Sequence, residues 1–274
     1  MAEAKMRYHV GCSGWSYEGW KGTFYPRGLP ASRELAYYAT IFDVVEIDST
    51  FYNIPRHAVV QHWHDKTPEG FMFVAKLYQG ITHGLHEVAS NGAMEGLIER
   101  YFNALAPLAE KLQAVVIQFP PKLRTKYRDD VIALLDCLPA GSRYAIEFRD
   151  AAWFEDDTIM TRIRGQPNLS IAGSVHPDVE PFIKPTADFF VFRFIGDREL
   201  ETFGTIQREK LEEMQRIKTL MDAELQDIRD TFVFFNNHYA GFGPASANLF
   251  KQMVGIQPAR FGAAKGQATL GDFV

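Results

Sequence analysis

The amino-acid sequence predicts a single (β/α)8 barrel of the TIM type, with an irregular connection between the sixth and seventh strands. Three observations favour this fold class. Short apolar segments alternate with helix-like segments along all 274 residues, several segments are apolar throughout, and no linker-like stretch divides the chain. Strands apolar on both faces are typical of parallel sheets that helices cover, and α/β barrels often reach about 250 residues. An open doubly wound sheet is the structural alternative.

The apolar segments predict eight strands, at residues 8–11, 44–47, 71–76, 114–118, 143–148, 169–172, 189–194 and 231–235. Apolar residues at helical spacing predict helices over 32–42, with Ser32 as the cap, over 94–108 and over 211–228. Pro107 should kink or divide the second of these helices. Residues 173–188 have no helical pattern, so they are expected to form a loop.

Composition bounds the class of protein. With 46% hydrophobic and 23% charged residues, the chain is not disordered, collagenous or a coiled coil. The net charge of −5 does not indicate a polyanionic partner, and two cysteines are too few for a disulfide framework. We expect no signal peptide, and the sequence has no stretch of about 20 apolar residues. We expect one cytoplasmic domain over 1–274, with a tail at 256–274 and no membrane partner; the oligomeric state stays open.

Alternation within the strands predicts which side chains point into the barrel. Helices cover the outside, so the apolar set of each strand should point outward and the polar set inward. Each polar set ends at the carboxyl end of its strand, where barrel enzymes assemble their active sites. The inward residues expected there are Glu46, Lys76, Gln118, Glu147, Arg149, Arg193 and, in phase with Phe235, Asn237.

This ring of polar residues suggests a hydrolase-like enzyme for a glycoside or phosphodiester. Glu46 and Glu147 are the candidate general acid and base, since unequal surroundings can push two carboxyl pKa values apart. Lys76 is the third candidate catalytic residue. Together with Arg149 and Arg193 it would bind the anionic group or stabilise negative charge. The alternative is that these charges pair only with one another.

Other features flank the ring. Trp15 and Trp153 offer stacking platforms for a sugar or base, unless they simply close the end of the barrel. Gly241 and Gly243 precede a helix start at Pro244, where backbone N–H groups can bind an anion, although a plain turn also fits. No metal or cofactor is predicted. A divalent-metal site built from Glu46, Asp48, Glu147 and His238 is a weakly supported alternative.

Six colinear motifs then identify a relationship. GCSGWSYEGWKGTFYP, FDVVEIDSTFYNIP, FMFVAKLYQGITH, VVIQFPP, YAIEFRDAAW and FFNNHYAGFGPASAN resemble the YecE-like family over about residues 8–255. The resemblance implies a TIM-type barrel and no settled activity. Its motif residues are Trp15, Glu46, Ser49, Tyr52, Lys76, His83, Gln118, Glu147, Arg149, Trp153, Arg193, Asn237 and His238; those outside the catalytic set are expected to bind substrate, apart from Ser49.

Two positions depart from the family pattern. Asp48 stands where the family commonly has Asn, and Ile195 stands where it commonly has His. Ile195 cannot donate a proton or bind a metal, so a mechanism that needs this histidine does not transfer. A small anionic substrate is the leading partner. The alternatives are a nucleic-acid-binding protein or phosphodiesterase, by fold-level likeness to barrel endonucleases, and a non-catalytic binding module.

Overall fold

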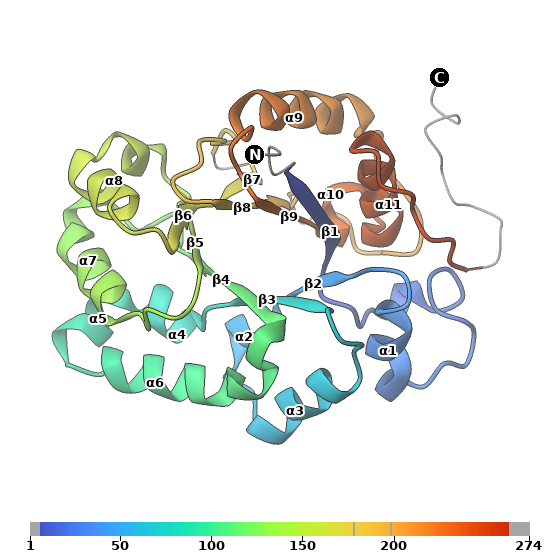
Figure 1. The fold of residues 1–274 in the computed structure, drawn as a ribbon, viewed down its shortest axis with the longest axis horizontal. Coiled ribbons are helices and arrows are strands. Elements are labelled where there is room, and N and C mark those ends of the chain that lie inside the picture. The colour runs from blue at the N-terminus through green and yellow to red at the C-terminus, as the bar shows by residue number, and fades with distance from the viewer. Residues whose placement is uncertain (1–5, 178, 198, 263–274) are drawn as a thin grey trace, which may run out of the picture.

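The strands surround a central axis with the helices outside them, as Figure 1 shows. The computed structural model describes residues 6–177, 179–197 and 199–262. Within these residues all paired strands are parallel, in the order β6-β5-β4-β3-β2-β1-β9-β8-β7. Their bounds are β1 Arg7–Ser13, β2 Val44–Ile47, β3 Met72–Lys76, β4 Leu112–Gln118, β5 Tyr144–Glu147, β6 Leu169–Ile171, β7 Gly173–Val175, β8 Phe189–Phe194 and β9 Asp230–Phe235.

The sixth barrel strand is split between two partners. Its first part, β6, pairs with β5, and its second part, β7, pairs with β8, so this segment almost closes the barrel. Gly173 lies at the change of partner, where a Cβ atom would be 2.6 Å from the Phe192 ring. Where β6 and β8 are not paired, Ser170 Oγ donates a hydrogen bond to the Phe189 carbonyl at 2.8 Å. The predicted barrel is confirmed, with one of its eight strands divided into two.

The helices follow the expected alternation. They are α1 Glu34–Tyr38, α2 Ser49–Tyr52, α3 His57–Asp65, α4 Gln79–Thr82, α5 Leu85–Ser90, α6 Met94–Leu105, α7 Arg128–Cys137, α8 Asp157–Arg164, α9 Leu211–Glu224, α10 Asn237–Ala240 and α11 Gly243–Met253. Short 3-10 helices span Glu18–Trp20, Ala31–Arg33, Ala106–Lys111, Thr125–Tyr127 and Ala151–Glu155. No described helix is long and apolar enough to cross a membrane.

Three local predictions can be compared with these bounds. The helix before Pro107 ends at Leu105 and continues as a 3-10 segment, so the predicted division is confirmed. The predicted cap at Ser32 is wrong, because Ser32 lies inside a 3-10 turn and Arg33 occupies the N-cap of α1. Between β7 and β8 the described residues contain no helix, as expected for this connection.

The apolar core has two layers. Outward side chains such as Val45 and Ile47 pack against the helices. An inner layer fills the barrel with Val44, Val74, Ala114, Val116, Ala145, Ala172, Phe189, Val191, Phe232 and Phe234. The predicted inward phase is therefore confirmed for the strands that carry Glu46, Lys76, Glu147 and Arg193. It is wrong for β9, because Phe235 belongs to the outer layer and Asn236, not Asn237, is in phase with the interior.

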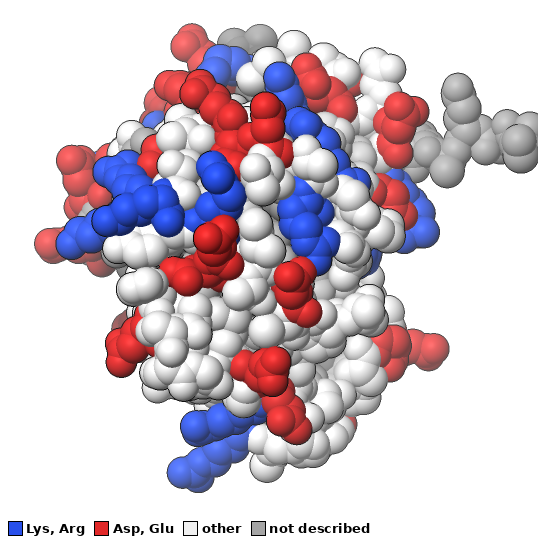
Figure 2. Space-filling model, turned by 90° about the vertical axis from the view of Figure 1, so that its left-hand side faces the viewer, with Lys and Arg blue, Asp and Glu red and all other residues white. Residues whose placement is uncertain are grey.

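The last two features of the fold are the distribution of charge on one side of the surface and the packing of the expected tail. On the side of α7 and α8, Lys and Arg are interspersed with Asp and Glu, without a single-sign region (Figure 2). Within the expected tail at 256–274, the Phe261 ring packs on Phe24 at 4.9 Å between centroids. Residues 263–274 lie outside the described residues.

Candidate active site at the barrel mouth

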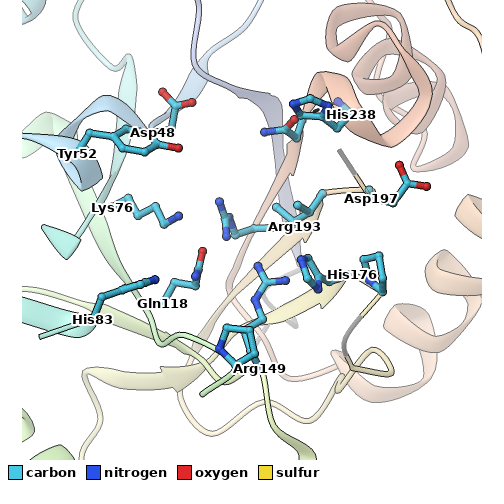
Figure 3. Close-up of a pocket in the computed structure, with 15 residues that line it drawn as sticks. Asp48, Tyr52, Lys76, His83, Gln118, Arg149, His176, Arg193, Asp197 and His238 are labelled. Atoms are coloured by element: carbon cyan, nitrogen blue, oxygen red, sulfur yellow. Dashed lines mark hydrogen bonds between the residues drawn. The ribbon is translucent and has the colours of Figure 1, made fainter. Parts of the chain in front are cut away.

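A polar cavity of about 480 Å³ lies at the carboxyl ends of the strands. In Figure 3 the side chains of Lys76, Gln118 and Arg193 point toward one another across it. Its lining residues share a position just at or after a strand end; they are Asp48, Tyr52, Lys76, His83, Gln118, Pro121, Arg149, His176, Pro177, Arg193, Ile195, Gly196, Asp197, Asn236 and His238.

Arg193 joins two carboxylates beneath this cavity. Its Nε lies 2.6 Å from Glu46 Oε1, and its Nη1 lies 2.6 Å from Glu147 Oε2. Arg149 pairs with the second oxygen of Glu147. All four side chains are at most 5% exposed. Charges buried to this degree are stable only when they are paired and hydrogen-bonded, and each of these four has an ion-pair partner within the group.

The two glutamates lie behind the cations and do not line the cavity. Burial alone would raise the pKa of Glu147, but Arg149 and Arg193 outweigh it and lower that pKa to about 2. Glu147 therefore stays ionised near neutral pH and cannot serve as a general acid. The arrangement does not support Glu46 and Glu147 as the acid and base; they hold the guanidinium groups in place.

Lys76 has different surroundings. Its side chain is 8% exposed, lines the cavity and lies with Nζ 3.7 Å from the centroid of the Phe51 ring. Burial, together with the charge of Arg193, lowers the pKa of Lys76 to about 7 despite the opposing glutamates. An amine with this pKa is substantially neutral at physiological pH, so it can act as a base or nucleophile.

Asp48 and Asp197 are the described carboxylates that line the cavity, and of the two Asp48 is the more buried one. Burial, with Glu46 nearby, raises its pKa, while Lys76 and a hydrogen bond from Tyr17 partly oppose the shift. The Tyr17 hydroxyl lies 3.3 Å from Asp48 Oδ2. Lys76 and Asp48 thus have pKa values moved toward neutrality from opposite sides, a pattern typical of groups that exchange protons.

Most of the predicted binding residues also meet here. Tyr52, His83, Gln118, Arg149, Arg193 and His238 all line the cavity. Burial and Lys76 lower the pKa of His83, which favours its neutral form. Tyr52 is 55% exposed at the rim. It also lines an adjoining cavity of about 330 Å³ with Tyr17, Asp48, Phe203, Asn236, Asn237 and His238.

Both predicted tryptophan platforms lie elsewhere. Trp153 is buried, its ring stacks on Phe148 at 4.9 Å, and its Nε1 donates to the Leu123 carbonyl. It cannot also stack on a substrate. Trp15 packs edge-on against Trp63 and does not line the mouth cavity. These placements favour the alternative in which the two indoles pack the end of the barrel.

Asn237 and the following glycines are used internally. Asn237 Oδ1 accepts hydrogen bonds from Trp20 Nε1 at 3.0 Å and from the Gly243 N–H at 2.9 Å. The suggested anion site at the start of α11 is therefore not supported, because its amide already has a partner and Gly243 is buried. Asn237 reaches only the adjoining cavity.

Sequence reasoning missed several mouth residues, among them Asn236, His176 and Asp197. Asn236 continues the inward alternation of Phe232 and Phe234, but the strand is apolar on both faces, so its sequence does not show which face is inward. His176 lies in the irregular connection after β7, where no periodicity predicts direction. For the metal alternative, no three His, Cys, Asp or Glu side chains in the described ranges are grouped so as to hold an ion.

The fold and cavity together define a TIM-type barrel with a charged pocket at its carboxyl end. The chain belongs to the family described as protein of unknown function DUF72, whose model matches residues 9–269. It is 25% identical over 280 residues to the UPF0759 protein YunF of Bacillus subtilis, covering 91% of this chain and 95% of that protein. It is 26% identical over 146 residues to the UPF0759 protein YecE of Escherichia coli, covering 53% of this chain and 50% of that one.

Solved structures give the same fold. A DUF72 family protein from Enterococcus faecalis matches with a TM-score of 0.74 and 21% identity, over 93% of this chain and all of that chain. A DUF72 family protein from Thermotoga maritima matches with a TM-score of 0.72 and 27% identity, over 90% and 98% respectively. The YecE-like relationship expected from the motifs is confirmed.

Proposed function

We propose that this protein is an enzyme that acts on a small anionic substrate in the mouth cavity, with the Lys76 amine as its reactive group. One observation carries the proposal: the cations Lys76, Arg149 and Arg193 line the cavity, while Glu46 and Glu147 lie behind them. A carboxylate or phosphate in the cavity could therefore contact the Arg149 and Arg193 guanidinium groups beside the Lys76 amine. Such charge-assisted contacts are strong and directional.

The proposal assigns the remaining polar groups by position. Arg149 and Arg193 bind the anion, and their orientation is fixed in advance by Glu46 and Glu147, which is what electrostatic preorganisation requires. Asp48 and His83 are assigned as the groups that exchange protons with Lys76, because burial raises the pKa of Asp48 and lowers that of His83. Hydrolysis by two glutamates, the reaction expected from the sequence, is not part of this proposal because Glu147 stays ionised.

Calorimetric titration with inorganic phosphate and with oxalate tests the anion site. Arg149→Met should weaken binding by at least ~10-fold, the loss of about one charge-assisted contact. Arg162→Met is the matched control, since Arg162 pairs with Asp136 on the outer helices. Equal affinity in both variants would overturn the anion site, and thermal melting must show that each variant is folded.

Turnover tests the enzymatic part of the proposal. A panel of small phosphate and carboxylate compounds should include a substrate whose conversion is lost in Lys76→Met. Conversion that survives this substitution would show that another group reacts. No conversion of any panel member, despite measured anion binding, would favour the non-catalytic binding module.

Binding of a nucleic-acid end is the second candidate, and the exposed Tyr52 at the rim is the observation that favours it. An exposed aromatic ring beside cations can stack on an unpaired base. In a titration with a short single-stranded oligonucleotide, affinity should fall steeply with salt and should be lost in Tyr52→Ala. Affinity indifferent to salt and to Tyr52 would remove this candidate.

A further inference from the structure

Lys76 is held on a rigid part of the molecule. It ends β3, and its backbone N–H donates to Thr50 Oγ1 at 3.1 Å. Its carbonyl accepts hydrogen bonds from Thr50 Oγ1 at 2.8 Å and from the Tyr101 hydroxyl at 2.9 Å. Reactive groups are most accurately placed when they extend from a strand whose neighbours are locked, and three hydrogen bonds lock this strand end.

The amine of Lys76 contrasts with that of Lys111, another buried lysine, which ends the 3-10 segment before β4. Lys111 is 4% exposed, and its Nζ donates to the His64 and Thr67 carbonyls at 2.8 Å and to Thr67 Oγ1 at 3.1 Å. These three acceptors satisfy the hydrogen-bonding capacity of the Lys111 ammonium, which is therefore a structural cation. Across the described residues, by contrast, no carboxylate lies within ion-pair distance of Lys76 Nζ, which lies over the Phe51 ring and lines the cavity.

We infer that Lys76 is a nucleophile that forms an imine with a carbonyl substrate carrying a nearby carboxylate or phosphate. The inference rests on the proposed function and deepens it by naming the substrate class, a 2-oxo acid or an oxo-phosphate. Arg149 and Arg193 would bind the anionic end beside the amine. A cavity of about 480 Å³ accommodates a molecule of this kind.

The step balances without an oxidant or reductant. The Nζ lone pair attacks the carbonyl carbon and forms the C–N bond, while the carbonyl oxygen takes up a proton and becomes a hydroxyl. Nitrogen loses its protons, the hydroxyl is protonated and leaves as water, and the C=N bond forms. Amine plus carbonyl thus gives imine plus water. Asp48 and His83, which line the same cavity, can supply and accept the protons.

Reductive trapping tests the inference. The full-length protein is incubated near neutral pH with glyoxylate, the smallest 2-oxo acid, and sodium borohydride, and adducts are mapped by peptide mass spectrometry. Lys76 should be modified at least ~10-fold faster than the exposed Lys66, because a larger fraction of its amine is neutral. Acetaldehyde, which has no anion for Arg149 and Arg193 to bind, should show a smaller preference, since only the larger neutral fraction of the amine then favours Lys76.

Two variants separate the outcomes. Lys76→Arg removes the nucleophilic amine and leaves Arg149 and Arg193 in place, so it should lose the adduct while phosphate still binds. Lys111→Arg is the matched control and should still be modified at Lys76. Phosphate binding together with equal rates at Lys76 and Lys66 would overturn the imine and leave the anion site standing. If the wild-type protein binds no phosphate, the proposed function itself is overturned.

Discussion

Arg193 binds Glu46 side-on, with Nε 2.6 Å from Oε1 and Nη2 3.2 Å from Oε2. This two-point contact joins β8 to β2 across the interior of the barrel, between strands that are not neighbours in the sheet. It fixes the plane of the guanidinium that faces the cavity. The pair therefore contributes both to the stability of the barrel and to the shape of its mouth.

Removing one carboxylate from this network should be costly. Glu46→Gln leaves the buried Arg193 with only Glu147, and breaking a buried pair typically costs about 3–5 kcal/mol. Urea unfolding at neutral pH measures the loss. The double variant Glu46→Gln/Arg193→Met should lose less than the sum of the two single variants, because the pair is removed as a unit. Additive losses would contradict the coupling.

Glu147 should make stability depend on acid pH. Its folded pKa of about 2 lies below the ordinary value of 4.5, so the unfolded chain binds the proton more readily. The resulting stabilisation, about 3 kcal/mol, is fully present above pH ~4.5 and is lost as pH falls toward ~2. Urea unfolding between these values should show a smaller pH slope in Glu147→Gln. Equal slopes would show that Glu147 is not responsible.

Lys76 should destabilise the folded protein, as expected for a residue kept for reactivity. Its pKa falls from 10.5 to about 7, so the charged form is disfavoured on folding. Between these values the unfolded chain binds more protons, and stability rises with pH; below pH ~7 the full cost, on the order of 5 kcal/mol, applies. Lys76→Met should therefore raise the melting temperature at pH ~6, and the gain should shrink toward pH ~10.

Gly196 should tolerate no side chain. Both Gly196 and Gly28 have φ of +82°, but a Cβ at Gly196 would lie 2.2 Å from the His238 carbonyl oxygen, whereas Gly28 has open space. Gly28→Ala should cost only the left-handed strain of about 1–2 kcal/mol. Gly196→Ala should cost more and should also weaken phosphate binding, since Gly196 lines the cavity. Equal losses of stability in the two variants, with phosphate binding unchanged, would contradict this prediction.

The parts of the fold and site that could be predicted follow strict periodicity. Alternation in β2, β5 and β8 places Glu46, Glu147 and Arg193 in the interior because each charge interrupts an apolar strand. In β9 the run Phe232–Phe235 is apolar at every position, so its sequence does not distinguish inside from outside, and the predicted phase favours Asn237 where the structure has Asn236 in phase with the interior.

Chemical roles were harder to predict than positions. The sequence shows that Glu147 and Arg193 share one end of the barrel, but not that they neutralise each other. That depends on distances of a few ångströms between strands remote in the chain. The reactivity assigned to Lys76 likewise depends on burial beside Phe51 and Arg193, which one-dimensional spacing does not contain.

The apolar layer that fills the barrel has a kinetic consequence. Within the described residues, Val44, Phe232 and the other inner residues are buried beneath the charged network, so the cavity is closed toward the inside of the barrel. Substrate and product would therefore share the same anion-binding groups at the mouth. For the proposed reaction, a product that retains the anion should compete with fresh substrate and slow turnover as it accumulates.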